Sequence, residues 1–273
     1  MVQKPKVITY IVLSVYTCIV LAPCVWMFLT AFKTSTELYK NRLGLPEVWH
    51  FEHFVIATKM ANIPRYFVNT IFMVCIVFIF GVGLGSMAAY GLTRIDFLFR
   101  KKLNLFFLAG LMVPIQAVVV PLYRMAADLN ALNNLFYLGL VYAAFSLPLI
   151  IVIIGGFISQ IPEAIEESAV IDGCNRFDLF SKIILPLIPE GIISATILVG
   201  LNVWNGLLLP LLFLSKHNIK TISIGMRSFF ADYTSSPTLL IAGCFVSMLP
   251  ILILYAVLQE RMIRGLTMGA VKG

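Results

Sequence analysis

The sequence predicts an all-α integral membrane protein with six transmembrane helices and one structured connection between the fourth and fifth. Hydrophobic residues make up 60% of the chain and charged residues only 12%, and the mean hydropathy is +0.96. A soluble globular domain is about half apolar and a quarter charged. The charges are also clustered, so that six long stretches contain no Asp, Glu, Lys or Arg: 7–32, 66–93, 103–123, 129–162, 191–215 and 233–259.

Each of these stretches is long enough for a transmembrane helix, which needs about 20 residues to cross the bilayer core. A transmembrane β-barrel would show alternating polarity in segments of about ten residues, whereas these stretches are continuously apolar. We therefore expect a single transmembrane domain over residues 1–273. Its spans are predicted at approximately 7–32, 66–93, 103–124, 135–158, 189–214 and 238–260.

The first span follows a basic start with Lys4 and Lys6, which is also typical of a secretory signal peptide. Its apolar run is longer than the roughly 7–15 residues of a signal peptide, and no small-x-small cleavage site closes it. The sequence therefore favours an uncleaved first span.

The orientation follows from Lys and Arg in the connections, because cytoplasmic loops are enriched in these residues. With six spans, both termini lie on the same side, and that side collects eleven of the 20 Lys and Arg residues. Basic residues cluster next to the third span (Arg100, Lys101, Lys102) and the sixth (Arg261, Arg264). We predict that both termini are cytoplasmic. The net charge of +7 then reflects the anionic inner leaflet rather than a nucleic-acid partner.

The sequence lacks the motifs of common enzymes and metal sites. There is no G-x-x-x-x-G-K-[ST] phosphate loop, no H-E-x-x-H and no G-x-S-x-G. His50 and His53 have a spacing that suits a metal, but no third ligand is evident, so no metal site is predicted. No C-x-x-C pair occurs among the five cysteines. We expect a non-catalytic protein.

The spans also lack charged residues well inside them. Proton- and sodium-driven transporters usually keep ionisable residues near the membrane midplane. If the protein moves a solute, its energy must therefore come from another chain.

One charged segment interrupts this apolar pattern between the fourth and fifth spans. The connection 159–188, called the acidic segment below, contains five of the 13 acidic residues. Glu163, Glu166 and Glu167 would place negative charge at the start of a short helix, where the helix dipole favours it. Gly173 would end that helix.

A second helix is expected to follow, capped by Asn175 and leading through Ile183 towards the membrane. Such a segment could rest on the membrane surface or dock onto another protein. Interfacial helices prefer Lys and Arg, and an anionic leaflet would repel an acidic start. The sequence therefore favours docking.

The spacing within this segment resembles the cytoplasmic signature of permease subunits of bacterial binding-protein-dependent ABC importers. That signature reads E-A-A, three residues, G, nine residues, I, one residue, L-P. Every spacing is present, and only Ser168 replaces an alanine: Glu167-Ser168-Ala169, Gly173, Ile183 and Leu185-Pro186.

Other stretches resemble the carbohydrate branch of this family, in particular the smaller maltose-type permease protein. They are "IDG" at 171–173, "WN" at 204–205 and the ending "RMIRGLTMGAVKG" at 261–273, and the likeness runs from about Tyr10 to the C-terminus. Two departures occur: Cys174 replaces a frequent alanine, and Gly206 stands where an acidic residue often follows Trp-Asn.

The resemblance implies half of a sugar-import pathway that couples to a separate ATPase dimer through the acidic segment. It also implies a second homologous permease subunit and an extracytoplasmic sugar-binding protein as partners. This chain would bind no cofactor, because ATP and Mg would sit on the ATPase. The implied coupling residues are Glu163, Glu166, Glu167, Ser168, Ala169, Asp172, Gly173, Ile183, Leu185 and Pro186.

Polar residues inside the spans are the candidates for a sugar pathway. Asn202, Trp204 and Asn205 lie in the fifth span, and an indole can stack on a sugar ring. Such side chains also hold helices together, and both interpretations stay open. Weaker options are Asn69, Thr70, Gln116 and Ser146.

Two other classes of membrane protein remain as alternatives. A stand-alone secondary transporter or facilitator could also have six spans, but it would not need the acidic segment. A receptor or structural membrane protein is the third option. The sequence does not name the sugar.

Overall fold

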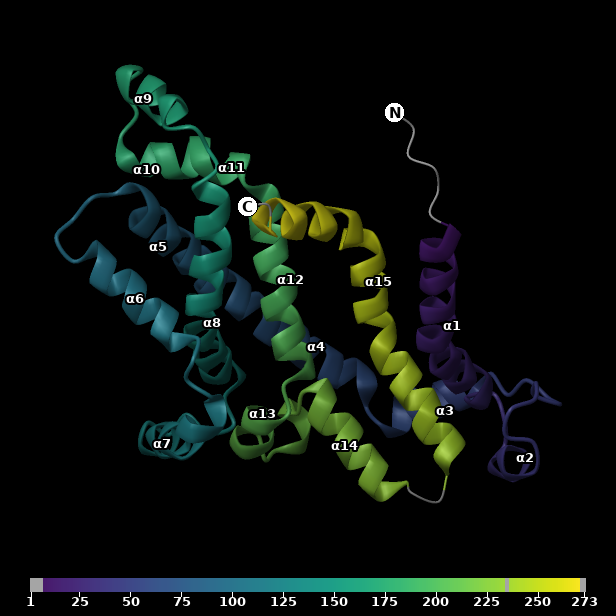
Figure 1. Ribbon diagram of the computed structural model, residues 1–273. Helices are drawn as coiled ribbons and strands as arrows, with labels where there is room; N and C mark the ends of the chain where they lie inside the picture. Colours follow the sequence, from purple (N-terminus) through teal and green to yellow (C-terminus); the bar gives the residue numbers. More distant parts are fainter. Residues whose placement is uncertain (1–6, 234–235, 271–273) are drawn as a thin grey trace. The chain divides into compact units, whose positions relative to one another are not determined.

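The computed structural model describes residues 7–233 and 236–270, and side chains up to Val257. Within these residues every regular element is helical (Figure 1). The predicted all-α fold is therefore confirmed. Lys4, Lys6 and Lys272, which contributed to the predicted orientation, lie outside the described residues.

Among the described residues, four helical stretches are long and apolar enough to cross a membrane: Val7–Thr30, Ile63–Arg94, Leu135–Ile158 and Pro237–Val257. The number reaches six if two bent helix pairs each count as one span. The predicted spans one, two, four and six correspond to these four unbroken stretches. The described residues therefore contain four candidate spans as unbroken helices, and six if each bent pair is one span.

The third predicted span is not the continuous helix expected over 103–124. It consists of α6 (Arg100–Gly110) and α7 (Ile115–Asp128), which are bent by 96° at residues 111–114. Pro114 precedes α7 directly and cannot donate a backbone hydrogen bond, which explains a helix boundary at this position.

The fifth span also differs from the prediction of one helix over 189–214. α12 (Pro189–Asn205) ends at Gly206, and a separate short helix, α13 (Leu208–Phe213), follows. The second bent pair lies at the start of this span, where 176–187 and α12 meet at 80°. Pro186 and Pro189 flank that bend.

The contacts divide the chain into two compact units. Unit 1 comprises 1–64 and 225–252, and unit 2 comprises 65–224 and 253–273. The single domain expected over residues 1–273 stays a prediction. Helix α4 (Ile63–Ile76), α14 (Ile222–Asp232) and α15 (Pro237–Ala270) each contribute residues to both units.

Unit 1 contains α1 (Val7–Thr30), α2 (Ser35–Lys40) and α3 (Glu52–Met60). Phe32 is 4% exposed and packs edge-on against the rings of Trp49 and Phe51. Lys33 is buried beside it, and its ammonium donates to the carbonyls of Asn41 and Gly44 at 2.7 and 2.6 Å. These contacts fix the loop that joins α2 to α3.

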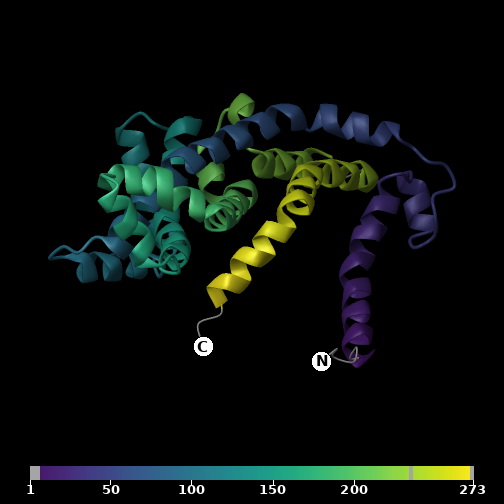
Figure 2. The ribbon, with the colours of Figure 1, turned by 90° about the horizontal axis from the view of Figure 1, so that it is seen from above.

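Unit 2 is built around α8 (Leu135–Ile158). Helix α4, the π-helical turn η1 (Val77–Val82) and α5 (Gly83–Arg94) follow one another without a break (Figure 2). Helix α8 packs against η1, α5, α6 and α12. Its residues Ile150, Ile154 and Ile158 have no exposed surface. The remaining short helix η3 (His217–Ile219) precedes α14.

Candidate functional site

The acidic segment forms the predicted short helix, turn and second helix. Helix α9 (Glu163–Ile171) is followed by α10 (Arg176–Asp178), η2 (Leu179–Ile184) and α11 (Leu185–Leu187). The last three form one continuous helix with a π-helical centre. The Asn175 side chain accepts hydrogen bonds from the backbone N–H groups of Phe177 and Asp178, at 2.9 and 3.0 Å. The predicted cap is therefore confirmed.

Gly173 ends α9 in the left-handed conformation, with φ of +87°. The N–H of Gly173 donates to Val170 O and the N–H of Cys174 donates to Ala169 O, both at 3.0 Å. This pair of hydrogen bonds is the Schellman pattern, which favours glycine because other residues pay for a positive φ. A Cβ atom at Gly173 would meet no atom within 4 Å, so backbone conformation alone explains the glycine here.

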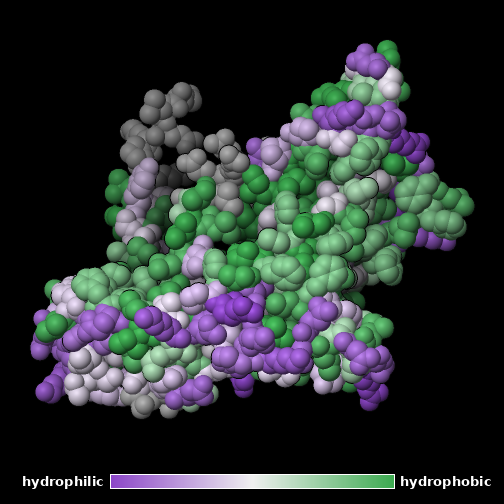
Figure 3. Space-filling view, turned by 180° about the vertical axis from the view of Figure 1, so that it is seen from behind, coloured by the Kyte–Doolittle hydropathy of each residue, from purple (hydrophilic) through white to green (hydrophobic). Residues whose placement is uncertain are grey.

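The surface of the acidic segment combines exposed charge with exposed apolar side chains. Ile165, Val170, Ile171 and Phe177 are 40%, 56%, 86% and 65% exposed. Figure 3 shows hydrophilic residues gathered over α9 and α10 at the upper right, above helices with a largely hydrophobic surface. Large apolar side chains on a charged segment outside the spans indicate an interaction surface.

The ten sequence-predicted residues of this segment do not share one environment. Glu167, Ser168 and Gly173 are exposed together with Glu163, Asp172 and Pro186, whereas Ile183 and Leu185 are half-buried and Ala169 is buried. Five of the six exposed residues lie on α9 or on the turn that follows it. Ala169 belongs to the buried core of unit 2, and Ile183 and Leu185 pack against that core. Glu166 pairs with Arg94.

Arg94, the last residue of α5, fixes α9 in place. Its Nε lies 2.7 Å from Glu166 Oε1, and its Nη1 donates to Glu163 Oε1 at 3.3 Å. Its Nη2 donates to the carbonyl of Ile158 at 2.8 Å and also to that of Ile161. The Arg94 side chain is only 10% exposed. One guanidinium therefore joins the ends of α5 and α8 to the first turn of α9.

The two glutamates paired with Arg94 are unequal. The Glu163 side chain is 80% exposed, whereas that of Glu166 is 14% exposed. Burial raises the pKa of Glu166 above its ordinary value, Arg94 opposes this shift, and Glu163 adds to it. Burial therefore affects the pKa of this carboxylate more than the Arg94 charge does. A buried pair of this kind fixes where α9 lies rather than adding much stability.

A groove of about 730 Å³ runs between α9 and the α5–α6 connection. Its lining includes Arg94, Arg100, Glu163, Glu166, Glu167 and Arg176. Arg100 donates to the carbonyls of Leu92 and Thr93 and pairs with Asp96, so it caps the end of α5. The sequence pattern assigned Arg94 and Arg100 no role in holding the acidic segment. An arginine at a span end on the same side as an acidic loop is the signal that could have indicated their roles.

A second site lies within the spans of unit 2. A cavity of about 460 Å³ is bordered by both helix breaks, at residues 110–115 and 206–209, and by α8. Asn202, the first of the proposed pathway residues, lines it together with Tyr142, Phe145 and Ser146. Asn205 is exposed outside this lining, and Trp204 is 9% exposed and packs edge-on against Phe67.

The other polar residues of the spans hold the chain together instead. Asn69 donates to the carbonyls of Asn218 and Lys220, at 3.0 and 2.9 Å. The hydroxyl of Thr70 accepts from the N–H of Ile222 at 3.0 Å. Gln116 is exposed outside the lining of the cavity. Asn69 and Thr70 therefore join α4 to the residues just before α14 and to its first residue.

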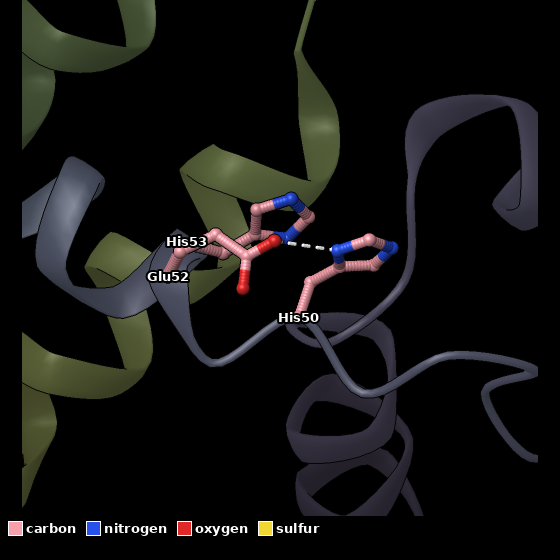
Figure 4. Close-up of side chains that lie close together, drawn as sticks. All are labelled: His50, Glu52 and His53. Atoms are coloured by element: carbon pink, nitrogen blue, oxygen red, sulfur yellow. Dashed lines mark hydrogen bonds and ion pairs between the residues drawn. The ribbon is translucent and has the colours of Figure 1, made fainter.

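Unit 1 contains a separate polar cluster, shown in Figure 4. His50 Nδ1 lies 2.6 Å from Glu52 Oε1, and His53 Nδ1 lies 3.2 Å from the carbonyl of Ala31. One ligand atom from each of His50, Glu52 and His53 can be chosen so that all lie within 4.8 Å of one another. The third ligand that sequence analysis did not find is Glu52, which stands between the histidines in the chain. These three residues have the donor types of a metal site.

Comparison with known proteins points to one family. Residues 81–267 match the family described as "Binding-protein-dependent transport system inner membrane component". The chain is 32% identical to the probable ABC transporter permease protein YurM of Bacillus subtilis, over 97% of this chain and 88% of that protein. It is also 32% identical to the diacetylchitobiose uptake system permease protein DasC of Streptomyces coelicolor, over 92% and 91%.

The fold is that of a solved transporter as well. A crystal structure of a bacterial ABC transporter involved in the import of the acidic polysaccharide alginate contains a similar chain, with a TM-score of 0.81. The match covers 93% of this chain and 95% of that one, at 18% sequence identity.

Proposed function

Because the chain belongs to the family of binding-protein-dependent transport system inner membrane components, we propose that it is the transmembrane subunit of an ATP-driven sugar importer. It performs no catalysis and forms half of the solute pathway. The relatives named for diacetylchitobiose, arabinooligosaccharides and starch degradation products support a short oligosaccharide as the solute.

The acidic segment is proposed to couple this subunit to its ATPase. The observation that carries this assignment is the exposed apolar group Val170, Ile171 and Phe177 beside the Gly173 turn, outside the spans. Closure of an ATPase dimer would push on this surface. Arg94 would pass the movement to α5 and α8, because it joins both helices to α9.

The proposed assembly contains four further components: a second homologous permease subunit, two ATPase chains and an extracytoplasmic sugar-binding protein. A related alginate transporter has been solved in complex with a pentasaccharide-bound periplasmic protein, which supports the last of these. The ATPase holds ATP and Mg, and this chain holds no cofactor. The protein is a multi-pass membrane protein of the bacterial inner membrane, and we propose that both termini are cytoplasmic.

The experiment that tests this function is reconstitution of the chain with its co-purifying partners in proteoliposomes. Radiolabelled diacetylchitobiose, arabinotriose and maltotriose serve as probes, with the binding protein on one side and ATP on the other. ATP-dependent accumulation of one probe is expected. Accumulation without ATP, or by a preparation of this chain alone, would support the secondary transporter and contradict the proposal.

A further inference from the structure

Two broken helices meet at one cavity. The α6–α7 break at 111–114 and the α12–α13 break at 206–207 lie in different spans, yet both border the same space of about 460 Å³. A break frees backbone N–H and C=O groups, and within a membrane this is tolerated only where protein or a water-filled cavity satisfies them. Discontinuous helices within the spans of transporters commonly form the polar solute site.

The side chains on this cavity are neutral, and two of them have free polar groups. Among the described residues, neither Tyr142 Oη nor the Asn202 amide makes a hydrogen bond within the protein, and both residues line the cavity. Ser146 donates to the carbonyl of Tyr142 at 2.7 Å and keeps its acceptor capacity. A phenol and an amide are the partners that sugar hydroxyls need.

Gly206 leaves the space that the Tyr142 hydroxyl occupies. A Cβ atom built on Gly206 would overlap Tyr142 Oη and would lie 3.0 Å from the carbonyl oxygen of Asn202. Any larger residue at this position would thus displace the phenol from the mouth of the α12–α13 break.

The lining sets the chemical class of the ligand. It contains no Asp, Glu, Lys, Arg or His, and Phe145 supplies an aromatic surface. A neutral, aromatic-walled cavity can stack on the apolar face of a sugar ring while Tyr142 and Asn202 bond its hydroxyls. A uronic acid would bring a charge into a space without a counter-charge, at a large cost. The volume lies within the roughly 300–1,000 Å³ of small-molecule sites.

We propose that Tyr142, Asn202 and Phe145 form a sugar-binding subsite on this subunit, selective for a neutral sugar ring during passage. This inference rests on the proposed function, because it assumes that a sugar crosses the membrane here. It gives this subunit a direct part in selecting the sugar, in addition to the selection made by the binding protein.

The test is the ratio of sugar transported to ATP hydrolysed by the reconstituted complex. The probe is whichever of diacetylchitobiose, arabinotriose or maltotriose the wild-type complex accumulates. Tyr142→Phe and Asn202→Ala are each expected to lower this ratio by about tenfold, which is the loss of one to two hydrogen bonds. Asn205→Ala is the matched control, because Asn205 lies on the same helix outside the cavity, and its ratio should equal that of the wild type.

The outcomes separate the subsite from the proposed function. If the wild type accumulates a probe and both Tyr142→Phe and Asn202→Ala keep its transport ratio, the subsite is wrong and the function stands. If uptake and hydrolysis fall together with the yield of assembled complex, these residues only support the fold and the subsite is again wrong. If the wild type accumulates no probe with ATP, the proposed function fails and the subsite falls with it.

Discussion

The two clusters of charged and ionisable side chains at Arg94 and His50 differ in how far they reach along the chain. Arg94 contacts Glu163, which is 69 residues away, and bonds the carbonyls that end α8. His50 pairs with Glu52, only two residues away. The Arg94 side chain is 10% exposed, whereas Glu52 is 58% exposed. A buried, long-range charge determines where whole helices lie, while an exposed local pair affects only its own loop.

The largest effect is expected from removing the guanidinium at Arg94. Arg94→Ala leaves Glu166 buried without its partner and frees the carbonyls of Ile158 and Ile161. Breaking a buried ion pair on one side costs about 3–5 kcal/mol. We expect the chain to insert in the membrane, with ATP-dependent uptake reduced at least tenfold at matched expression. Normal uptake would show that α9 is held in place by other contacts.

Glu166→Gln changes the other partner of the ion pair with Arg94. Burial raises the pKa of Glu166, so the neutral amide avoids a desolvation cost that the carboxylate bears. We expect Glu166→Gln to keep most of the uptake that Arg94→Ala loses, because Arg94 keeps its hydrogen bonds to the carbonyls of Ile158 and Ile161. If the two variants were equally defective, the charge of Glu166 would be the essential feature instead of the position of Arg94.

The sequence predicted the local structure of the acidic segment, but it did not predict the contacts that Arg94 makes with it. Local signals suffice for the helix, the Gly173 turn and the Asn175 cap, because each is fixed within a few residues. Arg94 reaches its partners only through the packing of α5 against α8, which no local pattern encodes. The broken third span has a different cause: its continuous hydropathy predicts one span, although Pro114 is a local signal for a helix boundary.

An effect of comparable size is expected at the surface that α9 presents. Gly173→Asp is expected to leave the protein inserted and abundant, to weaken co-purification of the ATPase and to abolish uptake. Gly173→Asn is the matched control, because Asn and Asp both tolerate a positive φ and differ only in charge. The Asn variant should retain ATPase binding. If Gly173→Asp binds the ATPase normally and transports, the docking role of the acidic segment is wrong.

A smaller effect is expected from Glu167, which is exposed on α9. Glu167→Ala should weaken ATPase co-purification in the same direction as Gly173→Asp. The loss is about 1–3 kcal/mol if a charge-assisted contact to the ATPase becomes buried. Glu163→Ala offers a comparison on the same helix, because the 80% exposed Glu163 side chain already pairs with Arg94. Equal losses for both would indicate a general effect of negative charge on docking.

The smallest effect is expected from the cluster in unit 1. The hydrogen bond between Glu52 and His50 holds the pKa of Glu52 below the ordinary value of 4.5. His53 Nδ1 lies within hydrogen-bond distance of the carbonyl of Ala31. The stabilisation from Glu52 is therefore fully present above the ordinary pKa of 4.5, and it is lost as the pH falls through the lowered pKa of the folded protein. These contacts satisfy the three side chains without a metal. We expect His50→Ala and His53→Ala to keep uptake within about twofold of the wild type, as is usual for an exposed pair. Treating the purified protein with EDTA, and returning it to excess Mg²⁺ before the assay, should leave uptake unchanged. Equilibrium dialysis against zinc provides the decisive measurement: one tightly held ion per chain, lost in both variants, would turn this cluster from a local pair into a metal site.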